Sequence, residues 1–180
     1  MESLKELDER AVGDRFIDWF NTKFGLKYTF SRRAGEAPDL VYALPDKTEL
    51  FVEVTSAYYG KEYAKFMWNG VRSEEDQVLV TESVDDDSKL VTDIVRIINQ
   101  KCNKQYERHC ILVISSTCFW TSARALVQLL AQREFPENNF AGIYVHGRFS
   151  RLSLDFDGND YSMIPIKAYS NSGATNGKKT

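Results

Sequence analysis

The stretch "APDLVYALPDKTELFVEVTSAYY", residues 37–59, decides the predicted fold, because it contains two apolar runs separated by a short polar segment. Apolar runs rich in β-branched and aromatic residues and bounded by turn-forming residues are typical of strands. We therefore expect strands over 39–44 and 49–59, with a turn at Pro45–Lys47. A connection this short joins antiparallel strands, so the pair is predicted to be a hairpin.

Two acids stand inside these apolar runs: Asp39 opens the first and Glu53 interrupts the second. A buried carboxylate is costly unless it is paired or bound to a metal. Strand side chains alternate, so Glu53 and Thr55 share one face. With this turn, Asp39 is expected across the hairpin from Val54 or Thr55, and the two acids converge within reach of one metal ion. Two carboxylates, a backbone carbonyl and waters make a typical magnesium site.

The rest of the chain is predicted to be one α/β domain over residues 1–168, with a mixed central sheet flanked by helices. Helical periodicity and capping signals predict helices over 3–24, 61–71, 89–106 and 122–135. Further strands are expected over 26–33, 109–116, 140–147, 151–156 and 162–166. Residues 169–180 are polar and rich in glycine and serine, which predicts a disordered tail.

Composition narrows the function classes. The net charge of −3 gives no overall attraction to nucleic acid, so binding to DNA needs a local basic patch. Three cysteines without CxxC spacing and two histidines do not predict a zinc site. No apolar run reaches the roughly 18–20 residues of a membrane span, and the charged N-terminus is unlike a secretory signal. We expect a cytoplasmic protein without membrane contact, and the absence of glycine-rich phosphate loops predicts no nucleotide cofactor.

A third acid is predicted near the first two. Helical spacing places Glu9 on the same face as Val12, Phe16 and Phe20, so it points inward. An inward acid requires a partner, which is either a metal-linked water or an arginine.

The order helix, three-stranded meander, helix, strand, together with Pro38-Asp39 and Glu53-Val54-Thr55, resembles the PD-(D/E)XK nuclease superfamily. The resemblance covers residues 3–146 as topology and a few residues as motif. It implies a restriction-endonuclease-like αβββαβ core and metal-dependent hydrolysis of DNA phosphodiesters. It also implies Mg²⁺ or Mn²⁺ held by Asp39, Glu53 and the Val54 carbonyl, with Glu9 tuning the site. DNA is then the expected partner, with a homodimer or a protein partner setting target choice.

The sequence departs from the superfamily at Thr55, which stands where the motif has lysine. In the superfamily that lysine positions the attacking water and stabilises negative charge. Thr55 can order a water but carries no charge. Divergent members supply the lysine from elsewhere, and the candidates here are Lys61, Lys65 and Lys101. Lys101 lies at the edge of the apolar face of its predicted helix, so it can reach inward.

Several other interpretations stay open. Glu53 can be a buried acid that pairs with Arg32 or Arg33 on the neighbouring strand, and Asp39 can be an ordinary turn residue after proline. The aromatic and basic segment 56–72 fits either a core helix or a surface that grips nucleic acid. Without a motif lysine, the domain can be a catalytically inactive module that binds nucleic acid or protein, or an unrelated α/β interaction domain.

Overall fold

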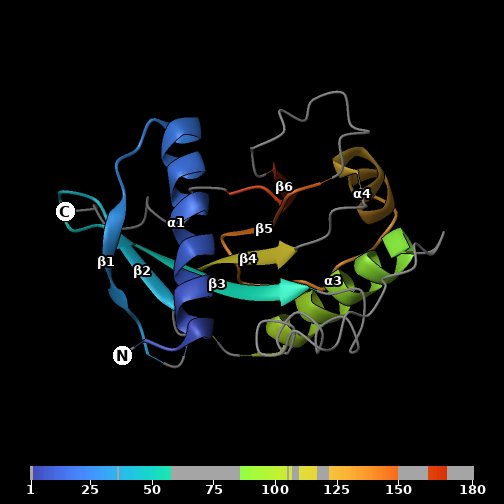
Figure 1. Ribbon diagram of the computed structural model, residues 1–180, viewed down its shortest axis with the longest axis horizontal. Coiled ribbons are helices and arrows are strands. Elements are labelled where there is room, and N and C mark those ends of the chain that lie inside the picture. Colours follow the sequence, from blue (N-terminus) through green and yellow to red (C-terminus); the bar gives the residue numbers. More distant parts are fainter. Residues whose placement is uncertain are drawn as a thin grey trace, which may run out of the picture.

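The computed structural model describes residues 2–35, 37–57, 86–104, 106, 110–116, 122–149 and 162–169. These residues form a single mixed α/β domain around one six-stranded sheet with strand order β1-β2-β3-β4-β5-β6 (Figure 1). The strands are β1 (Thr29–Arg33), β2 (Leu40–Ala43), β3 (Glu49–Ala57), β4 (Cys110–Ser116), β5 (Gly142–Gly147) and β6 (Ser162–Lys167). The helices are α1 (Leu4–Phe24), α3 (Asp86–Cys102) and α4 (Ala123–Leu130). The predicted α/β class with a mixed central sheet is therefore confirmed.

The sheet combines an antiparallel meander with a parallel centre. Strands β1, β2 and β3 pair antiparallel, β4 lies parallel to β3, β5 lies parallel to β4, and β6 returns antiparallel at the far edge. The two parallel connections contain α3 and α4, because a parallel pair needs a long crossover. Every residue of β4 and β5 is buried, which is typical of strands covered on both faces.

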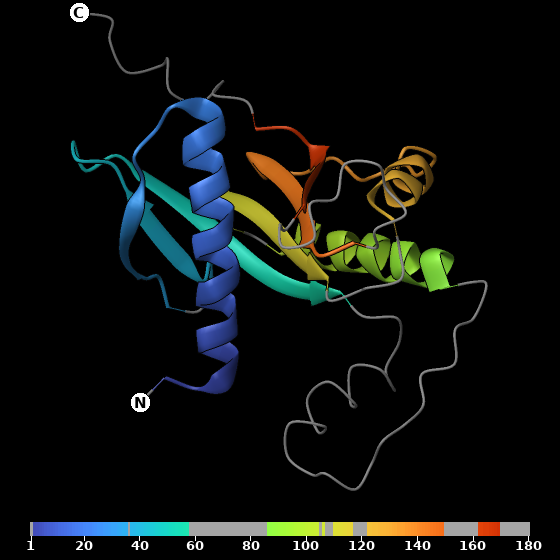
Figure 2. The ribbon, with the colours of Figure 1, turned by 45° about the horizontal axis from the view of Figure 1, so that its top comes forward.

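Two hydrophobic layers enclose the sheet, with α1 on one face and α3 and α4 on the other (Figures 1 and 2). The first layer packs Val12, Phe16 and Phe20 of α1 against Val52 and Val54. The second packs Ile94 and Ile98 of α3 and Leu126 of α4 against Phe51 and Leu112. Since side chains alternate along β3, Glu53 shares the face of Phe51 and lies beneath α3.

The predicted elements differ from the observed ones mainly at their ends. The first strand begins at Thr29 rather than residue 26, because the Asn21 side chain bonds both the N–H and the carbonyl of Tyr28 and ties that segment to the end of α1. Tyr169, predicted to open a disordered tail, instead packs its ring against Phe20 and Phe24. The predicted helix 61–71, the predicted strand 151–156 and residues 170–180 lie outside the described residues.

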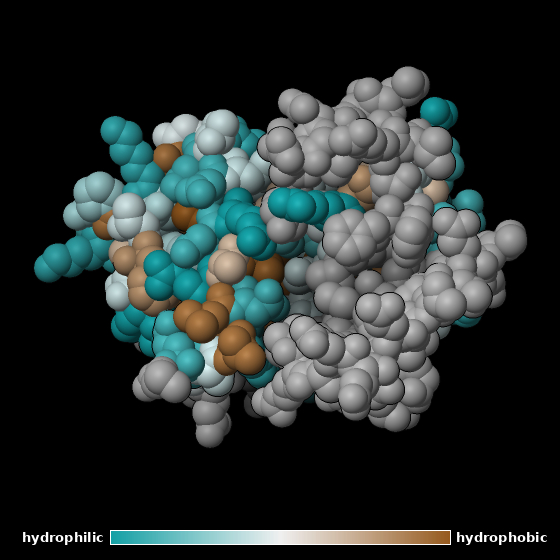
Figure 3. Space-filling model, viewed as in Figure 1, coloured by the Kyte–Doolittle hydropathy of each residue, from teal (hydrophilic) through white to brown (hydrophobic). Residues whose placement is uncertain are grey.

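The capping signals at both ends of α1 are confirmed. Ser3 and Glu6 form a reciprocal capping box, and Gly25 ends the helix with a left-handed φ of 66°. The surface around α1 is mostly hydrophilic, with small hydrophobic patches (Figure 3), and Leu4 and Leu7 are exposed in its first two turns. Among the helices that the structure describes, none combines the length and hydropathy needed to cross a bilayer.

Gly13 sets the close approach of α1 to β2. A glycine inside a helix costs up to about 1 kcal/mol relative to alanine, so its presence in α1 needs a reason. A Cβ at this position would collide with the Leu40 side chain and lie 2.5 Å from the Tyr42 hydroxyl. The missing side chain therefore lets α1 pack against β2, and this contact holds the start of α1 near Asp39.

We expect Gly13→Ala to lower the free energy of unfolding by about 1–3 kcal/mol, because the clash outweighs the gain in helix propensity. Urea denaturation measures the difference. Thr22→Ala, at an exposed position of the same helix, is the control and should be neutral or slightly stabilising. A Gly13→Ala variant more stable than the wild type would contradict the packing argument.

His146 gives the fold a pH dependence of its own. It is 1% exposed in β5, and burial, helped by the charge of Arg15, lowers its pKa to about 4. An unfolded histidine titrates near pH 6.5, so between pH 6.5 and pH 4 the unfolded chain binds a proton that the folded chain does not. The contribution of His146 to the free energy of unfolding should therefore fall on the order of 2 kcal/mol from pH 7 to pH 5.

Urea denaturation of the wild type and His146→Gln at these two pH values tests this expectation. The loss of stability at pH 5 should be smaller in the variant than in the wild type. Equal losses in the two proteins would show that His146 does not carry the dependence.

Candidate functional site

The hairpin register brings the two acids of the opening stretch together. Leu40 pairs with Val52, so continuing the antiparallel register by one residue places Asp39 opposite Glu53. Beyond this pair, the Asp39 side chain contacts the N–H of Val54, one of the two residues predicted to lie across from it. Residues directly opposite each other project to the same face of a sheet. Both carboxylates therefore lie on the face covered by α3.

Asp39 is held directly before β2 by the backbone of β3. The Val54 N–H donates to Asp39 Oδ2 at 2.8 Å. Burial, and after it the charge of Glu53, raises the pKa of Asp39 to about 6. The N–H of Val54 acts in the opposite direction, and so does the charge of Lys101. A carboxyl whose pKa is raised by burial and by a neighbouring acid marks a candidate functional site.

Glu53 is paired with a lysine that comes from α3. The amine of Lys101 lies 2.5 Å from Glu53 Oε1, and the two side chains are 18% and 4% exposed. The Tyr106 hydroxyl donates to the same Oε1 at 3.2 Å. Glu53 Oε2 is buried and has no hydrogen-bond partner among the described residues. One oxygen of Glu53 is therefore occupied by the protein, and the hydrogen-bonding capacity of the other is unused within the described residues.

The alternative in which Glu53 pairs with Arg32 or Arg33 is wrong. Arg32 forms an ion pair with Glu49 instead, and Arg33 pairs with Glu2 at 3.0 Å and approaches Glu9 at 3.7 Å. The pairing of β1 with β2 shifts register between Phe30 and Arg32. Both arginines therefore form ion pairs with acids other than Glu53.

Of the three lysines predicted as substitutes for the motif lysine, Lys101 contacts Glu53 in the structure. Lys101 reaches Glu53 from the last turn of α3, where a cation is favourable because it complements the helix dipole. Lys61 and Lys65 lie outside the described residues. Thr55 is half-buried, two residues beyond Glu53 on the same face of β3. The position of the motif lysine is thus filled by a neutral residue, and a cation is supplied from the adjacent helix.

Glu9 contributes from the other side of the hairpin. Its side chain is 12% exposed, in keeping with its predicted inward orientation, and it lies 3.2 Å from Lys5 and 3.7 Å from Arg33. An arginine was one of the two expected partners. The charge of Glu9 also raises the pKa of Asp39, although less than burial and Glu53 do. Glu9 therefore adds to the local negative field without contacting Asp39.

The backbone of Val54 supplies a further oxygen. In an antiparallel pair the N–H and carbonyl of a residue point to the same neighbour, so the Val54 carbonyl points to the side where its N–H meets Asp39. The pairing of β2 with β3 ends at Leu40 and Val52, so Val54 lies beyond it, next to Asp39.

These oxygens are of the kind that a hard divalent cation prefers. The set comprises the Asp39 carboxylate, Glu53 Oε2 and the Val54 carbonyl. Within the described ranges, no group of three or more His, Cys, Asp or Glu side chains is arranged to hold a metal. Mg²⁺ does not require such a group, since it commonly binds through one or two carboxylates and keeps several waters.

Tyr106 is a site residue that the sequence reasoning missed. It was placed at the end of a predicted helix, whereas α3 ends at Cys102. Burial, followed by the charge of Glu53, raises the pKa of the Tyr106 hydroxyl, so it stays a hydrogen-bond donor at neutral pH. A single tyrosine at a helix end carries no sequence signal for this role.

We expect Asp39→Asn to increase the free energy of unfolding in the presence of EDTA by on the order of 2 kcal/mol at pH 8. The folded pKa lies above the unfolded value, so the charged form is disfavoured in the native state above pH 6. The gain should shrink as the pH falls from 6 to 4, where Asp39 becomes protonated in both states. Urea denaturation at pH 8 and pH 4 measures both effects.

Asp46→Asn is the matched control. Asp46 is exposed in the turn, and its hydrogen bonds with Thr48 lower its pKa, so its loss should destabilise the protein at pH 8. If Asp39→Asn is destabilising like this control, Asp39 is a structural acid and not a strained ligand.

Comparison of the chain with protein-family models, with curated proteins and with solved structures found no match in any of the three. The interpretation of this site therefore rests on its own geometry: two facing carboxylates with a backbone carbonyl, and a lysine delivered from the crossover helix.

Proposed function

We propose that this protein is a magnesium-dependent nuclease that hydrolyses DNA phosphodiester bonds, with Mn²⁺ able to replace Mg²⁺. The observation that carries the proposal is the contact between Lys101 and Glu53, 2.5 Å between amine and carboxylate. It returns a cation to a site whose sequence motif has Thr55 instead. Asp39, Glu53 and the Val54 carbonyl hold the metal.

Each side chain has a definite role in this proposal. The bound ion supplies a Lewis acid for a phosphoryl oxygen and lowers the pKa of a coordinated water. Asp39 and Glu53 provide the negative charge that attracts the ion. Lys101 offers its remaining N–H groups to the attacking water or to a phosphate oxygen, since an ammonium has three donors. Tyr106 fixes the orientation of Glu53, Thr55 can order a water beside it, and Glu9 reinforces the field.

The arrangement of elements supports a divergent PD-(D/E)XK assignment with a restriction-endonuclease-like core. The order α1-β1-β2-β3-α3-β4, with an antiparallel meander and β4 parallel to β3, is the one expected from the resemblance. Asp39 at the start of β2 and Glu53 within β3 occupy the motif positions. In this assignment the lysine has moved from β3 to α3.

One observation favours a second candidate, a catalytically inactive module that binds nucleic acid or a protein partner. Lys101 and Tyr106 already occupy Glu53 Oε1, so the pair can also be read as a closed structural ion pair. The two candidates differ in what Lys101 does. In the nuclease it serves the reaction, whereas in the inactive module it neutralises Glu53.

Metal binding and cleavage distinguish them. We expect calorimetry to detect Mg²⁺ or Mn²⁺ binding to the wild type, weakened tenfold or more by Asp39→Asn and by Glu53→Gln, because each change removes a charged ligand. Incubation with plasmid and single-stranded DNA should show metal-dependent cleavage that both variants lose. Lys101→Gln should lower cleavage on the order of a hundredfold. It should not weaken metal binding, because the loss of a nearby positive charge reduces the repulsion of the metal ion.

Lys89→Gln, at an exposed position of α3, is the control for a lost lysine on that helix and should cleave normally. Metal binding without cleavage would support the inactive module. If calorimetry detects no metal binding to the wild-type protein, the metal site is refuted and the acids are structural residues. Denaturation of each variant excludes loss of folding as the cause.

A further inference from the structure

A pocket of about 630 Å³ opens directly beside the candidate site. It lies between the end of α3, the start of β4, the segment before β5 and the end of β6. The lining residues are Lys101, Cys102, Lys104, Tyr106, Cys110, Glu137, Asn138, Asn139, Phe140 and Lys167. This volume is in the range of pockets that hold one small organic ligand.

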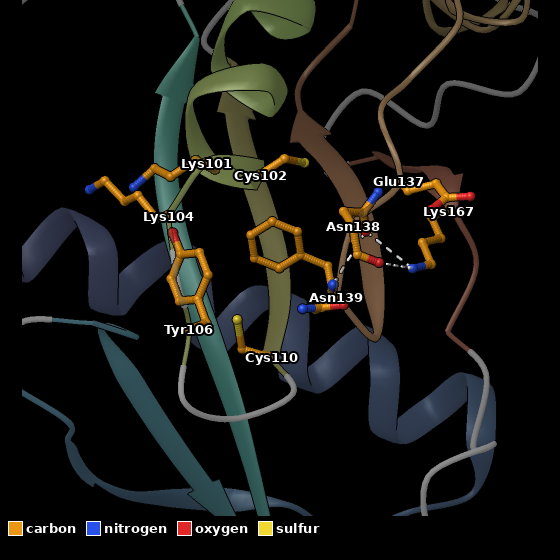
Figure 4. Close-up of a pocket in the computed structure, with 10 residues that line it drawn as sticks. Lys101, Cys102, Lys104, Tyr106, Cys110, Glu137, Asn138, Asn139 and Lys167 are labelled. Atoms are coloured by element: carbon orange, nitrogen blue, oxygen red, sulfur yellow. Dashed lines mark hydrogen bonds between the residues drawn. The ribbon is translucent and has the colours of Figure 1, made fainter.

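The pocket and the carboxylate site share a wall. Lys101 and Tyr106 line the pocket, and the same two side chains contact Glu53 Oε1. Figure 4 shows Lys101, Lys104 and Tyr106 on the β3 side and Lys167 on the opposite side. A ligand in the pocket therefore lies next to whatever is held at Glu53.

The lining is basic at both sides. Three lysines face one glutamate, and the charge of Lys101 is already balanced by Glu53. Lys167 donates to the carbonyl and to Oδ1 of Asn138, at 3.2 and 3.1 Å. These acceptors are neutral, so the charge of Lys167 persists, and one of its three N–H groups stays available. Lys104 is exposed and pairs with no carboxylate among the described residues. Each of the two lysines can therefore meet an anion such as a phosphate on its own side of the pocket.

An aromatic surface lies between these cations. Tyr106 packs against Phe140 with ring centroids 5.0 Å apart, and Phe140 is buried. Phe140 thus backs the tyrosine ring and fixes its plane. Aromatic rings beside lysines are the usual means by which proteins hold the bases of single strands, because every base has a face that can stack. Asn138 uses its amide group on Pro136 and on Phe140, so it is not free to read a base edge.

We propose that this pocket binds one unpaired nucleotide of a strand, with the phosphates on its two sides at Lys104 and Lys167 and its base against Tyr106. The proposal rests on the proposed function, because it makes that nucleotide the neighbour of the phosphodiester held at Asp39 and Glu53. A base inside a duplex is stacked and paired and cannot enter such a pocket. The substrate is therefore a single strand or an unpaired end, recognised without sequence preference.

The test measures binding in EDTA, where no cleavage occurs. Fluorescence anisotropy follows a fluorescein-labelled oligothymidylate, competed by unlabelled oligothymidylate, by thymidine 5′-monophosphate, by an oligonucleotide with an abasic site and by blunt duplex DNA. We expect the single strand to compete best and the duplex poorly. The abasic strand should bind several-fold more weakly, since stacking of one base contributes about 1–3 kcal/mol.

Two charge variants locate the site. Lys104→Glu should weaken oligothymidylate binding about tenfold and reduce the slope of log affinity against log salt by about 0.7, the value for one contact to a single strand. Lys27→Glu makes the same change at an exposed position before β1 and should have little effect. Tyr106→Phe should bind like the wild type, whereas Tyr106→Leu should not, because phenylalanine preserves the stacking surface.

The outcomes separate this inference from the nuclease. Lysine-dependent binding in a protein that never cleaves would support the pocket and refute the nuclease. Cleavage that needs Asp39, with equal affinities for Lys104→Glu and Lys27→Glu, would overturn the pocket and leave the nuclease standing. Tighter binding of the strand than of the monophosphate assigns a nucleic-acid strand to the pocket, and equal binding assigns a free nucleotide.

Discussion

The burial of Glu53 in the middle of β3 is the constraint on which the rest of the site depends. A carboxylate this far from water needs a counter-charge, and the amine of Lys101 meets it at 2.5 Å. Removing one partner of a buried ion pair typically costs about 3–5 kcal/mol, because the other charge remains buried. The pair therefore ties the end of α3 to the sheet, close to Asp39 at the beginning of the hairpin. Tyr106 meets the same oxygen of Glu53, and the pocket shares Lys101 and Tyr106 with this pair.

The local parts of this architecture could be predicted from sequence. The hairpin of β2 and β3 follows from two apolar runs and a proline turn, and α1 follows from its periodicity and its Ser3 and Gly25 caps. The positions of β4 and β5 in the order of elements could also be predicted, because both strands are continuous apolar runs. These features depend on neighbours within a few residues, where propensity and spacing are informative.

The long-range parts could not be assigned in the same way. Lys101 was one of three lysine candidates, and the choice of Lys101 depends on a contact between residues 48 positions apart. The alternative pairing of Glu53 with Arg32 or Arg33 failed because β2 lies between β1 and β3, and the two arginines pair with other acids. Tyr106 gave no signal at all, since its role arises from the turn after α3. Side chains that meet only after folding are the ones that sequence reasoning leaves open.

The origin of the lysine on a helix has a consequence for how this site tolerates change. A lysine two residues after the acid on one strand keeps its spacing whatever happens elsewhere in the chain. Lys101 instead depends on the phase of α3, in which each residue turns the helix by about 100°. Deleting one residue between the packed face at Ile94 and Ile98 and the last turn would swing the amine away from Glu53. The chemistry of the hairpin is therefore encoded partly in the length of a helix that contributes no acid to it.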